Sequence, residues 1–117
     1  NVKNHPVVEE GRKIRYSDEY KPNGTNANFV ELLGDSFIFV RTYERGVENE
    51  TLSCGTGVTA AALSATLKGY KSPVAVKVPG GELSVEFKTH ITGQTVSFHD
   101  IFLIGPAKMV FEGDLEL

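Results

Sequence analysis

The sequence is poor in cysteine, and this excludes several kinds of protein. Cys54 is the one cysteine among 117 residues. An intrachain disulfide framework and a multi-cysteine zinc site therefore cannot form. Such sparing use of cysteine is usual in a reducing compartment. We therefore expect a cytoplasmic protein.

Clustered positive charge and long apolar runs are also missing. The net charge is −3, and no basic cluster suggests contact with nucleic acid or an anionic membrane. The longest uncharged apolar run, residues 58–67, is too short to span a bilayer. Residues 1–4 lack the apolar core of a signal peptide. Because the chain does not begin with Met, we expect it to be a processed or truncated piece of a longer protein.

The apolar and polar patterns that are present predict one domain over residues 1–117. Hydrophobic residues make up 40% and charged residues 23% of the chain, as in ordinary globular proteins. Helical spacing with a proline in the first turn predicts a helix within residues 5–17. Alternating or continuous apolar runs bounded by turn residues predict six strands. These strands are expected at 28–33, 37–43, 74–78, 82–88, 95–104 and 108–111.

A second helix is predicted after Cys54, over residues 55–68, with Gly69 as its C-terminal stop. No charged residue occurs between Glu50 and Lys68. A helix that is apolar on every side is expected to be buried on every side. Together these elements predict an α+β fold in which a mostly antiparallel sheet wraps around one central buried helix.

The position of Cys54 directly before Gly-Thr-Gly suggests chemistry. A helix that begins at Gly55 or Thr56 presents unpaired N–H groups and the positive end of its dipole. These groups favour the thiolate, which makes Cys54 a candidate catalytic base or nucleophile. The N–H groups of Gly55 and Thr56 could also hold a ligand carboxylate. From the residues alone, Cys54 could equally be a packed, inert side chain.

The same turn also fits the loose dinucleotide pattern G-x-G-x-x-A, at residues 55–60. We reject that interpretation for two reasons. The preceding segment ENETLSC is polar, whereas the dinucleotide motif follows an apolar strand. The chain is also too short for a complete doubly wound sheet.

Glu44 and Arg45 stand where a predicted strand runs into a polar loop. A carboxylate and a guanidinium held together can recognise an ammonium and a carboxylate, and arginine suits bidentate carboxylate binding. With Cys54, they form a set suited to an amino-acid substrate. The alternative is a solvated pair at a strand end, which contributes little.

Several motifs resemble the second half of the diaminopimelate epimerase family. They are ERG at 44–46, ETLSCGTG at 50–57, GTNANF at 24–29, VPGGELSVEF at 78–87 and GPAKMVFEG at 105–113. The resemblance implies an enzyme of lysine and peptidoglycan-precursor biosynthesis that interconverts LL- and meso-diaminopimelate. It implies acid–base chemistry by two cysteines, without pyridoxal phosphate, metal or other cofactor.

The resemblance also implies roles for individual residues. Cys54 corresponds to the second catalytic cysteine, and Gly55 and Thr56 to the residues that hold the reacting carboxylate. Asn26, Glu44 and Arg45 correspond to those that read the distant, unreacting amino-acid centre. The family's first cysteine is missing, and the loop from Arg45 to Cys54 is one residue longer than expected. We therefore expect the partner of this chain to be a missing N-terminal domain, and the isolated chain to be inactive.

Some questions stay open at the level of sequence. A proline or hydroxyproline racemase of the same superfamily also carries a Cys-Gly-Thr-Gly turn, although its substrate offers nothing for Glu44 and Arg45 to read. A non-catalytic module that binds an anion at 55–57 is a second alternative. A homodimer is not excluded. Residues 110–117 could pack on this domain or on the missing one.

Overall fold

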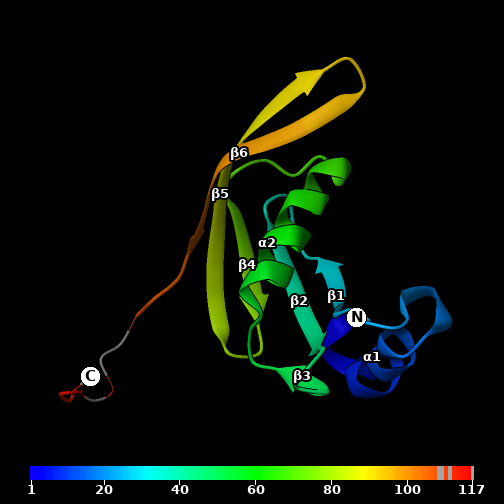
Figure 1. The fold of residues 1–117 in the computed structure, drawn as a ribbon. Helices are drawn as coiled ribbons and strands as arrows, with labels where there is room; N and C mark the ends of the chain where they lie inside the picture. Colours follow the sequence, from blue (N-terminus) through cyan, green and yellow to red (C-terminus); the bar gives the residue numbers. More distant parts are fainter. Residues whose placement is uncertain (108–109, 111, 117) are drawn as a thin grey trace.

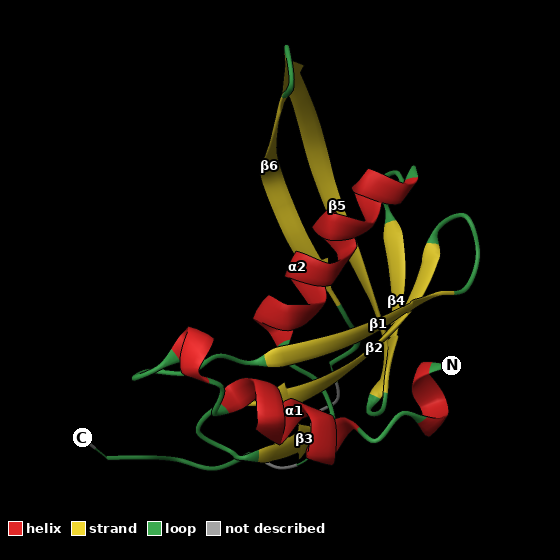
Figure 2. Cartoon of the chain, turned by 90° about the vertical axis from the view of Figure 1, so that its right-hand side faces the viewer, coloured by secondary structure: helices red, strands yellow, loops and turns green. Residues whose placement is uncertain are grey.

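The computed structural model describes residues 1–107, 110 and 112–116. It is an α+β fold built on a curled sheet, with one helix on each side of its first strands (Figures 1 and 2). The sheet order is β1-β2-β4-β5-β6, and β3 also pairs with β2. The strands are β1 (Ala27–Leu32), β2 (Phe37–Glu44), β3 (Asn49–Thr51), β4 (Val74–Val78), β5 (Gly81–Thr92) and β6 (Thr95–Ile104).

The sheet is mostly antiparallel, as the sequence predicts. Strand β2 pairs in parallel only with β4, where Phe37 lies opposite Ala75. Strand β3 occupies the remainder of that edge of β2, with Thr42 opposite Thr51. The edge of β2 that leads to Glu44 is therefore held by the segment that precedes Cys54.

Helix α1 (Val7–Arg15) packs against β1, β2 and β3. Acidic residues occupy its first turn and basic residues its last turn, which complements the helix dipole. Gly11 lies directly against Tyr43, so that a Cβ at this position would overlap the Tyr43 side chain. Glycine is unfavourable within a helix, but here the absence of a Cβ at Gly11 allows α1 to approach the sheet closely.

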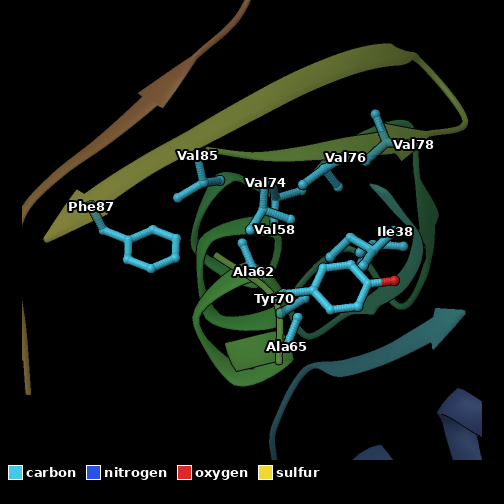
Figure 3. Close-up of a cluster of buried hydrophobic side chains, with 12 residues drawn as sticks. Ile38, Val58, Ala62, Ala65, Tyr70, Val74, Val76, Val78, Val85 and Phe87 are labelled. Carbon is cyan, nitrogen blue, oxygen red and sulfur yellow. The ribbon is translucent and has the colours of Figure 1, made fainter. Parts of the chain in front are cut away.

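Helix α2 (Gly55–Ser64) lies on the opposite side of the sheet and continues as the 3₁₀ helix η3 (Ala65–Lys68). Gly69 ends it with a left-handed φ of 90°, as predicted. The side chains of Val58 and Ala62 point toward those of Val74, Val76 and other residues of the main core (Figure 3). The sheet and α2 thus share one apolar core.

The prediction that this helix is buried on every side is wrong. Gly57, Val58, Ala61 and Ala62 are buried, but Ala60 and Ser64 are exposed. In η3, Leu67 is 82% exposed. The described strands curl around only one side of the helix (Figure 2). An apolar helix face is expected to pack against other apolar groups, but those groups need not belong to residues 1–117.

The remaining elements follow the predictions in part. β4 and β6 have the predicted limits, and β5 extends four residues further than expected, to Thr92. With β6 it forms a long hairpin that projects from the body of the domain (Figure 1). The strand predicted at 108–111 lies outside the described residues. Val110 and Leu115 in the C-terminal tail are more than four-fifths exposed. In the described part of the chain, no helix is long and apolar enough to cross a membrane.

Candidate functional site

Cys54 occupies the N-cap position of α2, as the sequence predicts. Its backbone is extended, and its carbonyl oxygen accepts the first helical hydrogen bond from the Val58 N–H, at 2.8 Å. Its Sγ lies 3.6 Å from Thr56 Oγ1, and the residue is 9% exposed. The thiol is therefore largely enclosed, and it points to the start of the helix rather than into the apolar core.

Gly55 and Thr56 form the exposed first turn of α2. Leu103 of β6 lies close to Gly55, and a Cβ on this glycine would stand 3.2 Å from Leu103 Cδ2. The backbone N–H groups of a first helical turn have no partner within the helix. This turn can therefore hold a carboxylate beside Cys54. A shallow hollow at this end of α2 is lined by Gly55, Thr56, Thr59, Ala60, Leu63 and Leu103.

The turn between β4 and β5 supports the segment that leads to Cys54. The Gly80 N–H donates a hydrogen bond to the Leu52 carbonyl oxygen at 2.9 Å. A Cβ on Gly80 would lie 3.1 Å from both the Cβ and the carbonyl oxygen of Leu52. The Pro-Gly-Gly sequence thus lets one backbone approach another closely two residues before the cysteine.

Asn26, Glu44 and Arg45 meet where β1 begins and β2 ends. Asn26 Oδ1 accepts a hydrogen bond from the Arg45 backbone N–H at 2.7 Å. Arg45 Nη1 donates to the carbonyl oxygens of Asn23 and Gly24, at 3.2 and 3.4 Å. The Thr51 hydroxyl donates to Glu44 Oε1 at 3.4 Å. The structure therefore brings Asn26 and Arg45 into direct contact, with Glu44 adjacent.

Asn28, which sequence reasoning missed, connects this group to α2. Its Oδ1 accepts a hydrogen bond from the Thr42 hydroxyl at 2.7 Å. It also lies against Gly57, where a Cβ would overlap it. Since side chains alternate along a strand, Asn26 and Asn28 point to one side, as do Thr42 and Glu44. The repeated asparagines of GTNANF were the available signal.

These four residues define what we call the front face of the β1–β2 pair: Asn26, Asn28, Thr42 and Glu44, on the side of α2. We call the opposite side, which carries Arg41 and Tyr43 and faces α1, the back face. The contact between Asn28 and Gly57 places the front face beside the first turns of α2. The two groups of predicted site residues therefore lie on the same side of the sheet.

The back face holds a charged pair that is mostly enclosed. Arg41 donates from Nε and Nη2 to the Glu50 carboxylate at 2.6 and 2.5 Å. Its Nη1 donates to three backbone carbonyl oxygens, those of Val2, Lys3 and His5, at 2.9 to 3.0 Å. Donation to Glu50 raises the pKa of Arg41 above its ordinary value, and partial burial opposes this. Arg41 thus ties the first residues of the chain to β3.

The part of the chain that the structure describes contains no group of three or more His, Cys, Asp or Glu side chains placed to hold a metal ion. The front face and the first turn of α2 bring together the Cys54 thiol, backbone amides, the amides of asparagine and the Glu44 carboxylate, with the Arg45 guanidinium adjacent. Such groups can bind an amino acid and move a proton at its stereocentre.

The chain is similar to known proteins over almost its whole length. The family model described as diaminopimelate epimerase matches residues 1–110. The chain is 48% identical to the diaminopimelate epimerase of Flavobacterium psychrophilum, over 96% of this chain and 43% of that protein. It is 46% identical to that of Aquifex aeolicus, over 93% of this chain and 38% of that protein. It is 42% identical to that of Chlorobaculum tepidum, over 100% of this chain and 44% of that protein.

The chain thus spans about two-fifths of the length of these curated relatives. The family match covers almost all of the chain, including every residue of the front face, Cys54 and the first turn of α2. The chain belongs to the diaminopimelate epimerase family.

Proposed function

We propose that the chain is the C-terminal domain of a diaminopimelate epimerase and supplies one of its two catalytic thiols, Cys54. One observation carries this proposal. Cys54 lies at the N-cap of α2 with its Sγ at the first turn, in a chain that matches the family over residues 1–110. The family match favours this function over the proline racemase and the anion-binding module.

The proposed reaction inverts one stereocentre by moving one proton off and another on. A thiolate on one face of the substrate takes the Cα proton and becomes a thiol. The electron pair left on Cα is shared with the adjacent carboxylate. A thiol on the opposite face then delivers its proton to Cα and becomes a thiolate. No redox partner is needed, and the two sulfur atoms end with their protonation states exchanged.

The first turn of α2 supports this chemistry. The reacting carboxylate docks on the N–H groups of Gly55 and Thr56 and gains negative charge as the Cα proton leaves. Donors that are already in place stabilise that charge without reorganisation. Enclosure strengthens such contacts and keeps water from exchanging the proton. Cys54 is already largely enclosed in this domain.

The far end of the substrate carries a second ammonium and a second carboxylate. We assign its recognition to Glu44, Arg45 and Asn26. Arg45 commits Nη1 to the carbonyl oxygens of Asn23 and Gly24, and a guanidinium has five N–H donors. Donors therefore remain for a carboxylate, while Glu44 can face the ammonium. Recognition of both the second ammonium and the second carboxylate restricts the enzyme to substrates with two amino-acid centres.

The second catalytic thiol is assigned to an N-terminal domain that this chain does not contain. Two observations support such a partner. The curated relatives are more than twice as long as this chain. The exposed side of α2, which includes Ala60, also borders the hollow beside Gly55 and Thr56. A domain packed there would enclose Cys54 and present its own thiol to the other face of the substrate. We retain the cytoplasmic setting and the place in lysine and peptidoglycan-precursor synthesis as parts of this proposal.

The experiment is solvent-proton exchange in a full-length protein that carries this chain. LL-diaminopimelate is incubated in D₂O, and deuterium at Cα and formation of the meso isomer are followed together. Cys54→Ala should lower the rate of meso formation by about 10³-fold or more, because inversion needs a thiol on each face. Ser53→Ala, at the exposed neighbouring position, is the matched control and should stay within about twofold of the parent.

Two results would contradict the proposal. One is a full-length protein that exchanges no Cα proton of diaminopimelate, and the other is a Cys54→Ala variant that keeps the parental rate. The 117-residue chain alone should form no meso isomer, because inversion needs a second thiol on the other face, and it should incorporate no deuterium, because without the second domain the substrate is not held and enclosed at Cys54.

A further inference from the structure

Glu48 lies in the turn between β2 and β3, three residues after Arg45, and has an unusual backbone. Its φ is +58°, in the left-handed region that residues with a Cβ rarely adopt. Its N–H donates to the Glu44 carbonyl oxygen at 2.8 Å, which closes the turn. Glutamate stands where glycine would fit more easily, so its side-chain contacts must offset the unfavourable backbone conformation.

The Glu48 carboxylate accepts hydrogen bonds from three groups. The Gly46 N–H and Arg15 Nε donate to Oε2, each at 3.0 Å. The Tyr43 hydroxyl donates to Oε1 at 3.1 Å. Tyr43 is fully buried, and the Arg15 side chain is only 16% exposed. The turn is therefore anchored to rigid groups on the back face and on α1.

These contacts constrain Arg45 from two sides. The Gly46 N–H, held by Glu48, belongs to the peptide that directly follows Arg45. Arg15, also held by Glu48, donates from Nη1 to the Asn23 carbonyl oxygen at 3.5 Å. The Arg45 guanidinium donates to that same oxygen at 3.2 Å. The backbone and the guanidinium of Arg45 are thus both tied to a single carboxylate.

We propose that Glu48 is a positioning residue that sets Arg45 for the distant amino-acid end of the substrate. This rests on the proposed epimerase function and deepens it. Glu48 does not touch the substrate and acts through Gly46 and Arg15. It should therefore control affinity for substrates with a second amino-acid centre, and leave the proton transfer at Cys54 unchanged. The Gly46 N–H, followed by Arg15 and Tyr43, holds the pKa of Glu48 below its ordinary value, so the carboxylate is ionised at neutral pH.

The test uses a full-length protein that carries this chain and compares Glu48→Gln, Glu48→Gly and Arg15→Gln. KM for LL-diaminopimelate should rise about tenfold in each, with kcat within about twofold of the parent. Glu48→Gly removes the carboxylate without straining the backbone, because glycine accepts a positive φ. It therefore separates the loss of the carboxylate from an effect of backbone strain. The double variant Glu48→Gln, Arg15→Gln should be no worse than either single variant, since both act through one network.

A second readout distinguishes positioning from general damage to the fold. 2-Aminoheptanoate has the reacting centre but lacks both groups at the far end. Its inhibition constant should be the same for the parent and for each variant, whereas a distorted domain would weaken its binding as well. Glu86→Gln, at an exposed position on β5, is the matched control and should leave KM unchanged.

The outcomes separate the two proposals. An unchanged KM in Glu48→Gly and Arg15→Gln would overturn the role of Glu48 in an otherwise active epimerase. An equal loss for 2-aminoheptanoate would assign Glu48 to the fold alone, and would overturn it too. If Glu48→Gln does not fold, Arg15→Gln decides by the same criteria. A parent protein without epimerase activity would remove the proposed function itself.

Discussion

The front and back faces of the β1–β2 pair are built from the same two strands and differ in how their polar groups are satisfied. On the front face, Asn28 and Thr42 pair through neutral groups, and the exposed first turn of α2 lies beside them. On the back face, Arg41 pairs with Glu50. The guanidinium of Arg41 is also covered by three carbonyl oxygens.

The difference follows from the alternation of side chains along a strand. One face of the strand pair can keep polar groups available for a ligand only if contacts on the other face hold the two strands in place. Here the back face does so, with charge pairs and with the close contact of Gly11 against Tyr43. Changes at Gly11 and Arg41 on the back should therefore mainly alter stability, and a change at the front, where α2 meets Asn28, should mainly alter activity.

The largest effect on stability is expected from Gly11→Ala. A Cβ at this position overlaps the buried Tyr43 side chain, and forcing α1 away should cost about 3 kcal/mol in the free energy of unfolding. Urea denaturation of the chain measures it. Gly34→Ala is the matched control, since no atom lies within 4 Å of its Cβ. A loss as small for Gly11 as for Gly34 would show that α1 does not brace the sheet.

Arg41→Gln should have the next largest effect. It leaves the Glu50 carboxylate without its charged partner, in a pair whose side chains are only 17% and 19% exposed. The expected loss of unfolding free energy is about 2 kcal/mol. Lys88→Gln breaks the exposed pair of Lys88 with Asp100 and should cost less than about 1 kcal/mol. Equal losses in the two urea titrations would contradict the difference between enclosed and exposed pairs.

Gly57→Ala tests the front face. The new methyl group would overlap Asn28 Oδ1 and shift α2, with Cys54, relative to Asn26 and Arg45. We expect kcat/KM of a full-length epimerase to fall about tenfold, with thermal stability changed little. Removing the Asn28 side chain as well should restore part of the activity. A Gly57→Ala variant with parental kcat/KM would show that the close contact between Gly57 and Asn28 is not needed for activity.

The smallest effect is expected from the pH dependence of Glu48. Its pKa is held low in the folded protein, first by the Gly46 N–H. The carboxylate therefore favours folding above about pH 4.3, where the unfolded group is also ionised. This contribution disappears as the pH falls through the lower folded pKa. Glu48→Gln should be less stable than the parent at neutral pH, and the difference should disappear at an acidic pH below the folded pKa of Glu48. Urea midpoints at both pH values check it, and a constant difference would point to packing rather than charge.

Much of the fold could be predicted because its apolar segments have clear ends. Gly69 and Pro79 mark two of those ends, and the pattern of β6 is unbroken. Strand β3 was missed because ENET is polar and shows no alternation. It is held instead by pairing with β2. The sequence of α2 predicted an apolar surface correctly, but the pattern carries no information about which molecule covers that surface.

The candidate site could be predicted only in part. Cys54 at a helix start followed from the Gly-Thr-Gly turn, whereas the role of Asn26 came from a resemblance. The contact of Asn26 with the Arg45 backbone depends on how β1 and β2 align, which no local pattern states. Nothing in the sequence distinguishes Glu48 from the other acidic residues between Glu44 and Ser53. Its partners Arg15 and Tyr43 come from distant parts of the chain.

Three glycines described above have a practical consequence for mutational scanning. Gly11, Gly57 and Gly80 each face a neighbour at a distance that leaves no room, or almost none, for a methyl group. A scan of every position would score them as intolerant, next to Cys54, although none of them takes part in proton transfer. Their intolerance would report close packing, against the side chains of Tyr43 and Asn28 at Gly11 and Gly57 and against the backbone of Leu52 at Gly80. An assay that separates folded yield from turnover would distinguish Gly11, where the expected loss is one of stability, from the reactive sulfur, whereas Gly57→Ala should lower turnover as a change at Cys54 does.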